Sequence, residues 1–413
     1  MRHRSLLILT AVLTTGALTL TACGSRDDSN GSGGSGGDGG TTTVVIGLDA
    51  PLTGDLSALG LGIKNSADLA VKQANAKKYV EGITFEIQAL DDQAQPSSGQ
   101  QNASKLVANK KVLGVVGPLN SSVGESMQKV LADEKLVQVS PANTSPSLTQ
   151  GQKWNEGTKE RPFASYFRTA TTDAVQGPFA AQYLFNDAKK KKVFVIDDKK
   201  TYGAGLAGTF KAEFEKLGGK IAGTEHIDPE TKDFSSVATK VKSSGADVVY
   251  YGGEYPAAGP LSKQIKKAGA KIPVVGGDGI YSAEYIKLSG KEGVGDLATS
   301  VGAPIDTLPS AKEFVANYEK AGYKEPFEAY GGYSYDAAWS IIEAVKAVAD
   351  ANDGKLPSDA RAKVAEAVGK VDFDGVTGKV SFDEFGDTTN KQLTVYEYKD
   401  GAWAAVKSGE LTS

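Results

Sequence analysis

The sequence predicts an α/β protein with two lobes, each built on a parallel β-sheet. The chain has 413 residues, two to three times a usual domain length of about 100 to 200 residues. Short apolar runs of the buried-strand type alternate with segments whose apolar residues recur at helical spacing. A long polar insertion around Trp154 interrupts this alternation, which then resumes. The restart predicts a second sheet.

The first part of the alternation predicts four strands of one parallel sheet. The run at 112–116 holds only valine, leucine and glycine, whereas Ile63, Ala67 and Ala70 recur at helical spacing. The strands are expected at 44–48, 83–87, 112–116 and 136–139, with helices over 59–76, up to Asn109 and through Leu131.

The second part predicts a second lobe, followed by a tail. The lobe has helices at 179–184, 208–217, 234–241 and 261–268, and strands at 193–196, from 221, at 248–250 and at 273–275. The tail has helices at 311–321, 333–349 and 360–368, and a strand pair around 395–396 and 403–404. Periodicity alone does not assign this tail to either lobe.

Composition excludes several classes of protein. Hydrophobic residues are 40% and charged residues 23% of the chain, the balance of a protein that folds in water. A formal net charge of −4 argues against a nucleic-acid-binding role. The single cysteine, Cys23, excludes an internal disulfide, and two histidines, His3 and His226, leave little for a metal centre. We therefore expect no metal, no cofactor and no nucleic acid.

The N-terminus predicts a targeting segment. Arg2 and Arg4 precede an apolar stretch over 6–20, which is typical of a secretory signal. The sequence around Cys23 resembles a lipobox, which implies removal of residues 1–22 and a lipid on Cys23 that holds the chain at a membrane. The alternative is a secreted protein without lipid. The glycine- and serine-rich remainder of 23–41 predicts a flexible linker.

Two loops at the carboxyl ends of predicted strands favour a small anion. In open parallel sheets, ligands bind at these ends. Ser121 stands in the first loop, and Ala142 and Thr144 stand in the second. Both loops are rich in hydroxyls and lead into helices, whose free N–H groups attract a carboxylate; the alternative is that these residues only cap helices. Asp278, flanked by glycines after the last strand of the second lobe, is expected to face a cleft and to pair with an ammonium group, or else to form a turn.

The stretch 203–208 matches the pattern G-x-G-x-x-G of dinucleotide sites. In such sites the strand runs directly into the first glycine, whereas here six residues, 197–202, intervene. A nicotinamide-dependent oxidoreductase is therefore a minor alternative. No nucleophile is paired with a base in the sequence, so we expect a binding protein rather than an enzyme.

From Val44 to its end, the chain resembles the substrate-binding lipoproteins of branched-chain amino acid ABC transporters, the leucine/isoleucine/valine-binding type. The order and spacing of several short segments carry the resemblance. They are 47–54, 90–92, 116–122, 140–144, 167–169 with 176–177, 198–205, 232–234, 250–253 and 382–386.

The resemblance implies specific binding roles. Ser121, the Ala142 N–H and Thr144 would hold the ligand carboxylate. Asp278 would pair with the ammonium group, and Tyr202 would close over the ligand from the second lobe. A buried zwitterion needs both charges paired and hydrogen-bonded.

Around the ligand side chain, this sequence departs from the family pattern. Leu59 replaces an aromatic residue, Glu254 stands where a further tyrosine is common, and Tyr330 matches an aromatic wall. A cysteine pair found in some relatives is replaced by Ala94 and Asn120. Because an unpaired buried acid is costly, Glu254 motivates the hypothesis of a polar or cationic ligand side chain. The alternative is that Glu254 faces solvent or pairs with a lysine.

The resemblance also implies two Rossmann-like lobes of the type I periplasmic binding fold, joined by a three-segment hinge. We expect one lobe at 42–168 plus 302–380 and the other at 169–301 plus 381–413, with crossovers near 168–172, 300–303 and 380–383. The protein would be an extracytoplasmic monomer, anchored through Cys23, that captures an amino acid by lobe closure and delivers it to an ABC permease. A sensory receptor module of the same fold remains the alternative.

Overall fold

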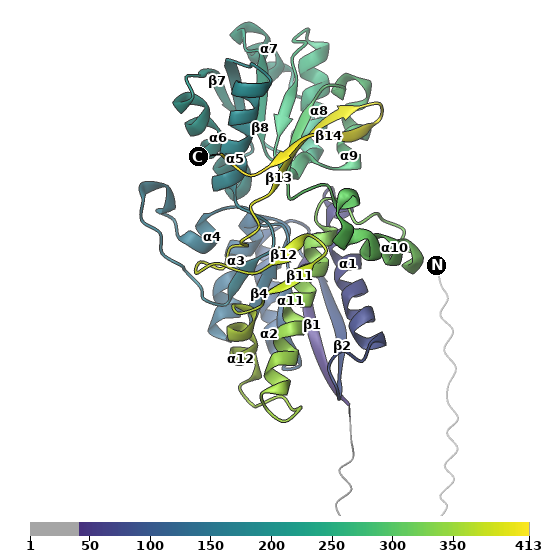
Figure 1. Ribbon diagram of the computed structural model, residues 1–413. Coiled ribbons are helices and arrows are strands. Elements are labelled where there is room, and N and C mark those ends of the chain that lie inside the picture. Colours follow the sequence, from purple (N-terminus) through teal and green to yellow (C-terminus); the bar gives the residue numbers. More distant parts are fainter. Residues whose placement is uncertain (1–40, 413) are drawn as a thin grey trace, which may run out of the picture. The chain divides into compact units, whose positions relative to one another are not determined.

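The computed structural model describes residues 41–412, and these belong to one compact unit. The predicted signal segment and Cys23 lie outside the described residues. Two large sheets organise the chain (Figure 1), as the sequence predicts.

The first sheet is parallel throughout, with the order β2-β1-β3-β4-β5. Four of its strands were predicted, and the three-residue β5 was missed because it is too short to show a pattern. The strands are β1 (Thr42–Ala50), β2 (Ile83–Asp91), β3 (Val112–Val116), β4 (Val137–Ser140) and β5 (Tyr166–Arg168).

Helices cover the first sheet, and part of the predicted tail supplies them. Helix α11 packs against α1, β3 and β4, and α12 packs against β3 and β4. Most of α11 is buried, which explains its nearly continuous apolar sequence. The helices are α1 (Ser57–Ala76), α2 (Pro96–Ala108), α3 (Ser121–Asp133), α4 (Ser147–Gln150), α10 (Lys312–Ala321), α11 (Gly331–Asp350) and α12 (Ala360–Val368).

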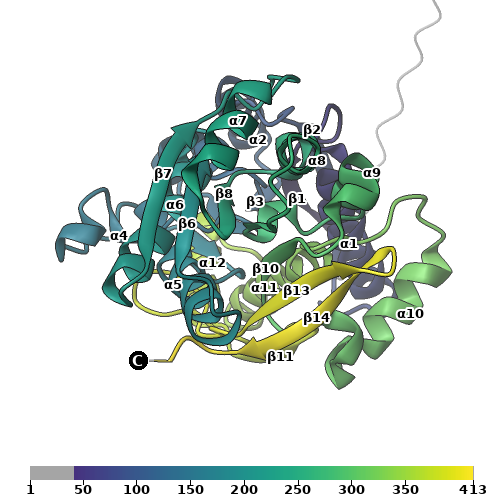
Figure 2. The same ribbon diagram turned by 90° about the horizontal axis from the view of Figure 1, so that it is seen from above.

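The second sheet has the order β14-β13-β10-β9-β8-β6-β7. Strands β6 to β10 run parallel, whereas β13 is antiparallel to both β10 and β14. The hairpin of β13 and β14 (Figure 2, yellow) thus places the end of the tail in the second lobe. The strands are β6 (Lys192–Asp197), β7 (Lys220–His226), β8 (Val248–Gly252), β9 (Val274–Gly276), β10 (Leu297–Val301), β13 (Leu393–Lys399) and β14 (Ala402–Gly409).

Three of the five helices of the second lobe begin earlier than the sequence predicts, one begins one residue later, and the last was not predicted. The five helices are α5 (Asp173–Gln182), α6 (Thr201–Lys216), α7 (Ser235–Ser244), α8 (Tyr255–Lys267) and α9 (Ala283–Ser289). The prediction that a helix begins at Gly208 is wrong, because α6 includes the whole glycine motif. Gly203 lies against strand β8, where an added Cβ would come within 2.5 Å of the Gly252 carbonyl oxygen. The glycine therefore permits close helix–strand packing.

The chain passes between the two sheets three times. The passages lie between β5 and α5, between β10 and α10, and between β12 (Gly378–Val380) and β13. Strand β12 pairs with β11 (Phe373–Gly375) in a small separate sheet. We propose that the three passages form the hinge, with the lobe boundaries given above.

Candidate functional site

A small cavity of about 20 Å³, room for about one water molecule, lies where loops of both lobes meet. Residues of the first lobe and residues that follow strands β6, β8 and β9 line it together, at the strand ends where ligands of such sheets bind. The lining residues are Leu59, Leu119, Asn120, Ser121, Ala142, Tyr202, Glu254, Gly279 and Tyr330. The structure thus brings together six of the eight residues that the sequence singled out. Of the other two, Asp278 is next to the lining residue Gly279, and Thr144 lies two residues from Ala142.

Most hydroxyl and N–H groups of the two loops that hold Ser121, Ala142 and Thr144 are already hydrogen-bonded within the protein. The Ala142 N–H donates to Ser140 Oγ at 3.2 Å, and Ser121 Oγ accepts from the Ser145 N–H at 3.4 Å. Thr144 is fully buried, and its Oγ1 forms no hydrogen bond of ordinary geometry within the described chain, although it lies close enough to the buried Asp173 carboxyl to oppose the burial-driven rise in the pKa of Asp173. A buried polar atom without a partner costs about 1 to 3 kcal/mol, so a ligand oxygen that accepts from Thr144 Oγ1 would offset this cost.

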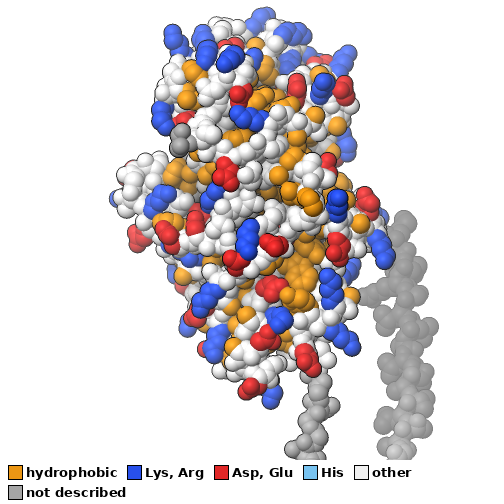
Figure 3. All heavy atoms as spheres, viewed as in Figure 1, with side chains coloured by type: hydrophobic (Ala, Val, Ile, Leu, Met, Phe, Trp, Pro, Cys, Tyr) orange, Lys and Arg blue, Asp and Glu red, His pale blue; other side chains and the backbone are white. Residues whose placement is uncertain are grey.

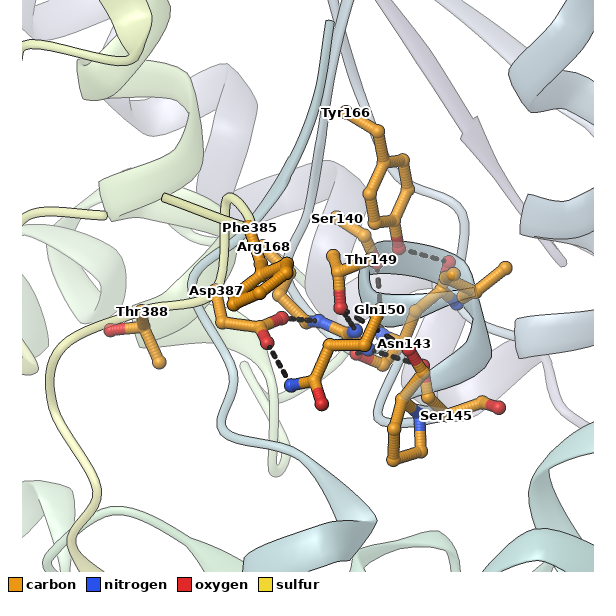
Figure 4. Close-up of polar contacts among 12 residues, drawn as sticks. Ser140, Asn143, Ser145, Thr149, Gln150, Tyr166, Arg168, Phe385, Asp387 and Thr388 are labelled. Carbon is orange, nitrogen blue, oxygen red and sulfur yellow. Dashed lines mark hydrogen bonds and ion pairs between the residues drawn. The ribbon is translucent and has the colours of Figure 1, made fainter. Parts of the chain in front are cut away.

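A buried arginine fixes the position of this loop (Figure 4). Arg168 Nη1 donates to the carbonyl oxygens of Asn143 (3.0 Å) and Ser145 (2.8 Å). Its Nε donates to Asp387 Oδ1 at 2.6 Å. Burial alone would raise the pKa of Asp387, but the charge of Arg168 and the hydrogen bonds from Gln150, Thr149 and Arg168 together outweigh it, so the pKa lies below its usual value. Both charges are therefore retained, and they hold the backbone on either side of Thr144.

Asp278 forms the acidic end of the site. Its Oδ1 accepts from Tyr202 Oη (2.7 Å) and Gln176 Nε2 (2.9 Å), and its Oδ2 accepts from Tyr330 Oη (2.8 Å). The expectation that this carboxyl is exposed to a cleft is wrong, because Asp278 is completely buried. Burial raises its pKa, and the hydrogen bonds only partly oppose this. A ligand ammonium would supply the missing counter-charge.

Glu254 is compensated by protein groups. It accepts from Asn120 Nδ2 at 2.7 Å and pairs with Lys200 Nζ at 3.6 Å. The alternative in which this acid pairs with a lysine is therefore the one that the structure bears out.

Several contacts join the two lobes around the cavity. Asn120 contacts Glu254, Tyr330 contacts Asp278, and the Tyr255 hydroxyl donates to the Asp55 carbonyl oxygen. The described conformation is thus one in which the lobes touch across the site.

Four residues of the site were missed as binding candidates. Leu119, Asn120 and Gly279 line the cavity, and Gln176 bonds to Asp278. Asn120 and Gly279 are direct chain neighbours of predicted residues and Leu119 lies two residues from Ser121, so their nearness in sequence was the available signal. Gln176 lies 102 residues from Asp278, so no local pattern could connect them.

Features expected of other site types are not found in residues 41–412. This part of the chain has no group of three or more His, Cys, Asp or Glu side chains that could hold a metal ion. No helix within it is long and apolar enough to cross a membrane. The glycine motif lies inside α6 rather than in a loop between strand and helix, so it lacks the geometry of a dinucleotide site.

Charged side chains of both signs are interspersed on the face shown in Figure 3.

Comparison with known proteins decides the family. The family model described as periplasmic binding protein matches residues 43–402. The chain belongs to this family. It is a binding protein with the type I fold, not an enzyme. The Leu/Ile/Val-binding protein homolog 1 of Brucella suis is 35% identical over 359 residues, which cover 87% of this chain and 91% of that protein.

Solved structures agree on the fold of this periplasmic binding protein. The leucine-binding protein LivK of Thermotoga maritima has a TM-score of 0.78 and 26% identity, covering 88% of this chain and 98% of its own. A solute-binding protein from R. palustris, in complex with 4-hydroxybenzoate, has a TM-score of 0.76 at 21% identity, covering 89% and 97%. At that identity the likeness shows the fold alone.

Proposed function

We propose that this periplasmic binding protein captures an amino acid, branched-chain or related, outside the cytoplasm by lobe closure and delivers it to an ABC permease. Two fully buried groups beside the cavity carry the proposal. Thr144 Oγ1 lacks a partner in the described chain, and the Asp278 carboxyl lacks a cation. A zwitterion satisfies both, since its carboxylate accepts hydrogen bonds and its ammonium group pairs with the acid.

The assignment of ligand atoms follows from this chemistry. The carboxylate would accept from Ser121, the Ala142 N–H and Thr144, and the ammonium group would contact Asp278 beside Tyr202. Leu59 and Tyr330 would flank the rest of the ligand. The named Leu/Ile/Val-binding and leucine-binding relatives support an amino acid. An aromatic acid without an amine, as in the R. palustris protein, would leave Asp278 without a counter-charge.

Isothermal titration tests the proposal. The purified chain is unfolded, freed of carried ligand, refolded and titrated with each of the twenty amino acids and with 4-hydroxybenzoate. We expect saturable binding of at least one amino acid and none of the aromatic acid. If only acids without an ammonium group bind, the role of Asp278 is wrong.

Lobe closure at the proposed hinge predicts a change in the size of the molecule on ligand binding. Closure around a ligand excludes water and buries both charges of the zwitterion. Small-angle scattering is therefore expected to show a smaller radius of gyration with ligand than without it. An unchanged radius would contradict capture by closure.

The cellular role and the anchor remain proposals of their own. Uptake of labelled ligand by cells lacking this chain would fall if it serves a permease, and would stay unchanged if it serves only as a receptor. The lipid on Cys23 is tested with the Cys23→Ser variant, which is expected to leave the membrane fraction. Retention of the variant there would reject the lipid anchor.

A further inference from the structure

Asn120 has one half of its amide engaged and the other half free. Its side chain lines the cavity and is only 5% exposed. Nδ2 donates to Glu254 Oε1 at 2.7 Å, whereas Oδ1 has no hydrogen-bond partner among the described residues. The cavity therefore has a buried acceptor in its wall that the protein leaves unsatisfied.

Glu254 determines which half of the amide is free. A carboxylate only accepts hydrogen bonds, so the NH₂ group of Asn120 must face it. The carbonyl oxygen of the amide then points away from Glu254. The reverse orientation would place two acceptors 2.7 Å apart.

Glu254 is a poor partner for a cationic ligand, because its charge is already matched. Lys200 Nζ lies 3.6 Å from Glu254 Oε2. Burial and then the charge of Glu254 raise the pKa of the neighbouring Asp198 carboxyl, which favours its neutral form. Because Lys200 and the Asn120 amide already satisfy Glu254, a cationic side chain would gain little from this carboxylate.

The remaining walls limit the ligand side chain. Leu59 and Leu119 are apolar and line the small cavity together with Asn120. A ligand side chain that enters between the lobes would place carbon against the leucines and a polar end at Asn120, and this small site favours a short side chain.

We propose that the bound amino acid has a short, uncharged side chain with a hydrogen-bond donor, such as a hydroxyl or amide, that donates to Asn120 Oδ1. Asn120 is then the specificity-determining residue, and Glu254 is a positioning residue that orients its amide. This inference rests on the proposed function and narrows its ligand from amino acids in general, branched-chain or related, to those that bear a hydroxyl or an amide. It also rejects the cationic half of the hypothesis drawn from Glu254.

Threonine and valine provide a matched pair of ligands, because a hydroxyl in one replaces a methyl in the other at nearly equal volume. A site with an unpaired acceptor rejects the analogue that lacks the donor. We expect threonine to bind about 10- to 100-fold more tightly than valine. Asparagine against leucine tests the amide in the same way, and lysine tests the charge.

Two variants separate the role of Asn120 from general effects on the fold. Asn120→Leu removes the acceptor with little change in shape, and is expected to abolish or reverse the preference for threonine. Asn65→Leu is the control, because Asn65 is also buried and its Nδ2 also faces a carboxylate, Glu325, at 3.4 Å, but it does not line the cavity. This control should keep the threonine-to-valine ratio of the unaltered chain.

The outcomes are distinct. Valine or leucine binding as tightly as threonine or asparagine in the unaltered chain would overturn this inference and leave the proposed function intact. Tightest binding of lysine or arginine would overturn it in favour of Glu254 as a counter-ion. No binding of any amino acid would reject the proposed function itself. Because the ligand ranking needs no variant, the test stands even if Asn120→Leu fails to fold.

Discussion

Arg168 and Asp387 form a buried ion pair, Nε to Oδ1 at 2.6 Å, between residues 219 positions apart. Both side chains are at most 1% exposed. Arg168 ends β5 and also bonds the loop that contains Thr144, while Asp387 lies in the passage that leads to β13. The pair thus links a proposed hinge segment to a proposed ligand loop.

Substitution of Arg168 by lysine is expected to destabilise the chain and weaken ligand binding. Lysine cannot bond Asp387, Asn143 and Ser145 together, and breaking a buried pair costs about 3 to 5 kcal/mol. Urea unfolding measures the stability and calorimetry measures the affinity.

The control for Arg168→Lys is Asp296→Asn, which disrupts another buried pair, Lys266–Asp296, in the second lobe. Its folded form should bind ligand normally. Equal losses of affinity in both variants would show that the effect on binding is a general consequence of lost stability.

Thr144→Val is expected to separate binding from stability. The threonine hydroxyl has no partner in the described chain, so its replacement by a methyl group should leave the free energy of unfolding unchanged or slightly higher. Ligand affinity should fall about 10- to 100-fold, because a buried hydrogen bond to a charged group is worth about 1.5 to 3 kcal/mol. A large loss of stability without loss of affinity would place Thr144 in the fold rather than in the site.

Asp278→Asn should have opposite effects on stability and on binding. Burial raises the pKa of Asp278, so the ligand-free protein bears a cost for its charge, and the neutral variant is expected to be as stable or more stable at pH 8. Loss of a buried partner for the ammonium group should weaken binding by about 2 to 5 kcal/mol. Thermal unfolding and calorimetry on the same sample measure both, and unaltered affinity would exclude Asp278 from the site.

The raised pKa of the Asp198 carboxyl implies that the free energy of unfolding depends on pH. Its pKa is raised to about 8, against about 4 in an unfolded chain. Between about pH 4 and pH 8 the folded state therefore keeps a proton on Asp198 that the unfolded state releases. Its stabilising contribution is therefore fully present below about pH 4 and is lost as pH rises toward 8.

Asp198→Asn should remove this contribution to the pH dependence. The stability of the unaltered chain, relative to the variant, is expected to fall between pH 5 and pH 8 by at most about 1.4 kcal/mol per pH unit. Urea unfolding at both pH values measures it. Parallel pH profiles for the two proteins would contradict a raised pKa.

Local pattern sufficed for the buried strands but not for α6. Strands β3 and β8 are apolar throughout and fully buried, so their sequences identify them. The start of α6 reads as a loop because glycine disfavours helix. Packing of Gly203 against Gly252 overrides that preference, and such a contact between distant residues has no local signature.

The candidate site likewise has a part that local sequence pattern predicts and a part that it does not. Ser121 and Ala142 stand at the ends of predictable strands, so their meeting follows from a parallel sheet. The pairing of Asn120 with Glu254 joins different lobes, at a separation of 134 residues. It depends on how the lobes meet, which periodicity within either lobe does not specify.

Titration of the refolded chain and of its Asp278→Asn variant with the twenty amino acids tests the central claim most directly. We predict that at least one uncharged amino acid binds the unaltered chain, and that the variant binds the same ligand at least about 30-fold more weakly. Absence of binding to the unaltered chain, or equal affinity in the variant, would contradict the account.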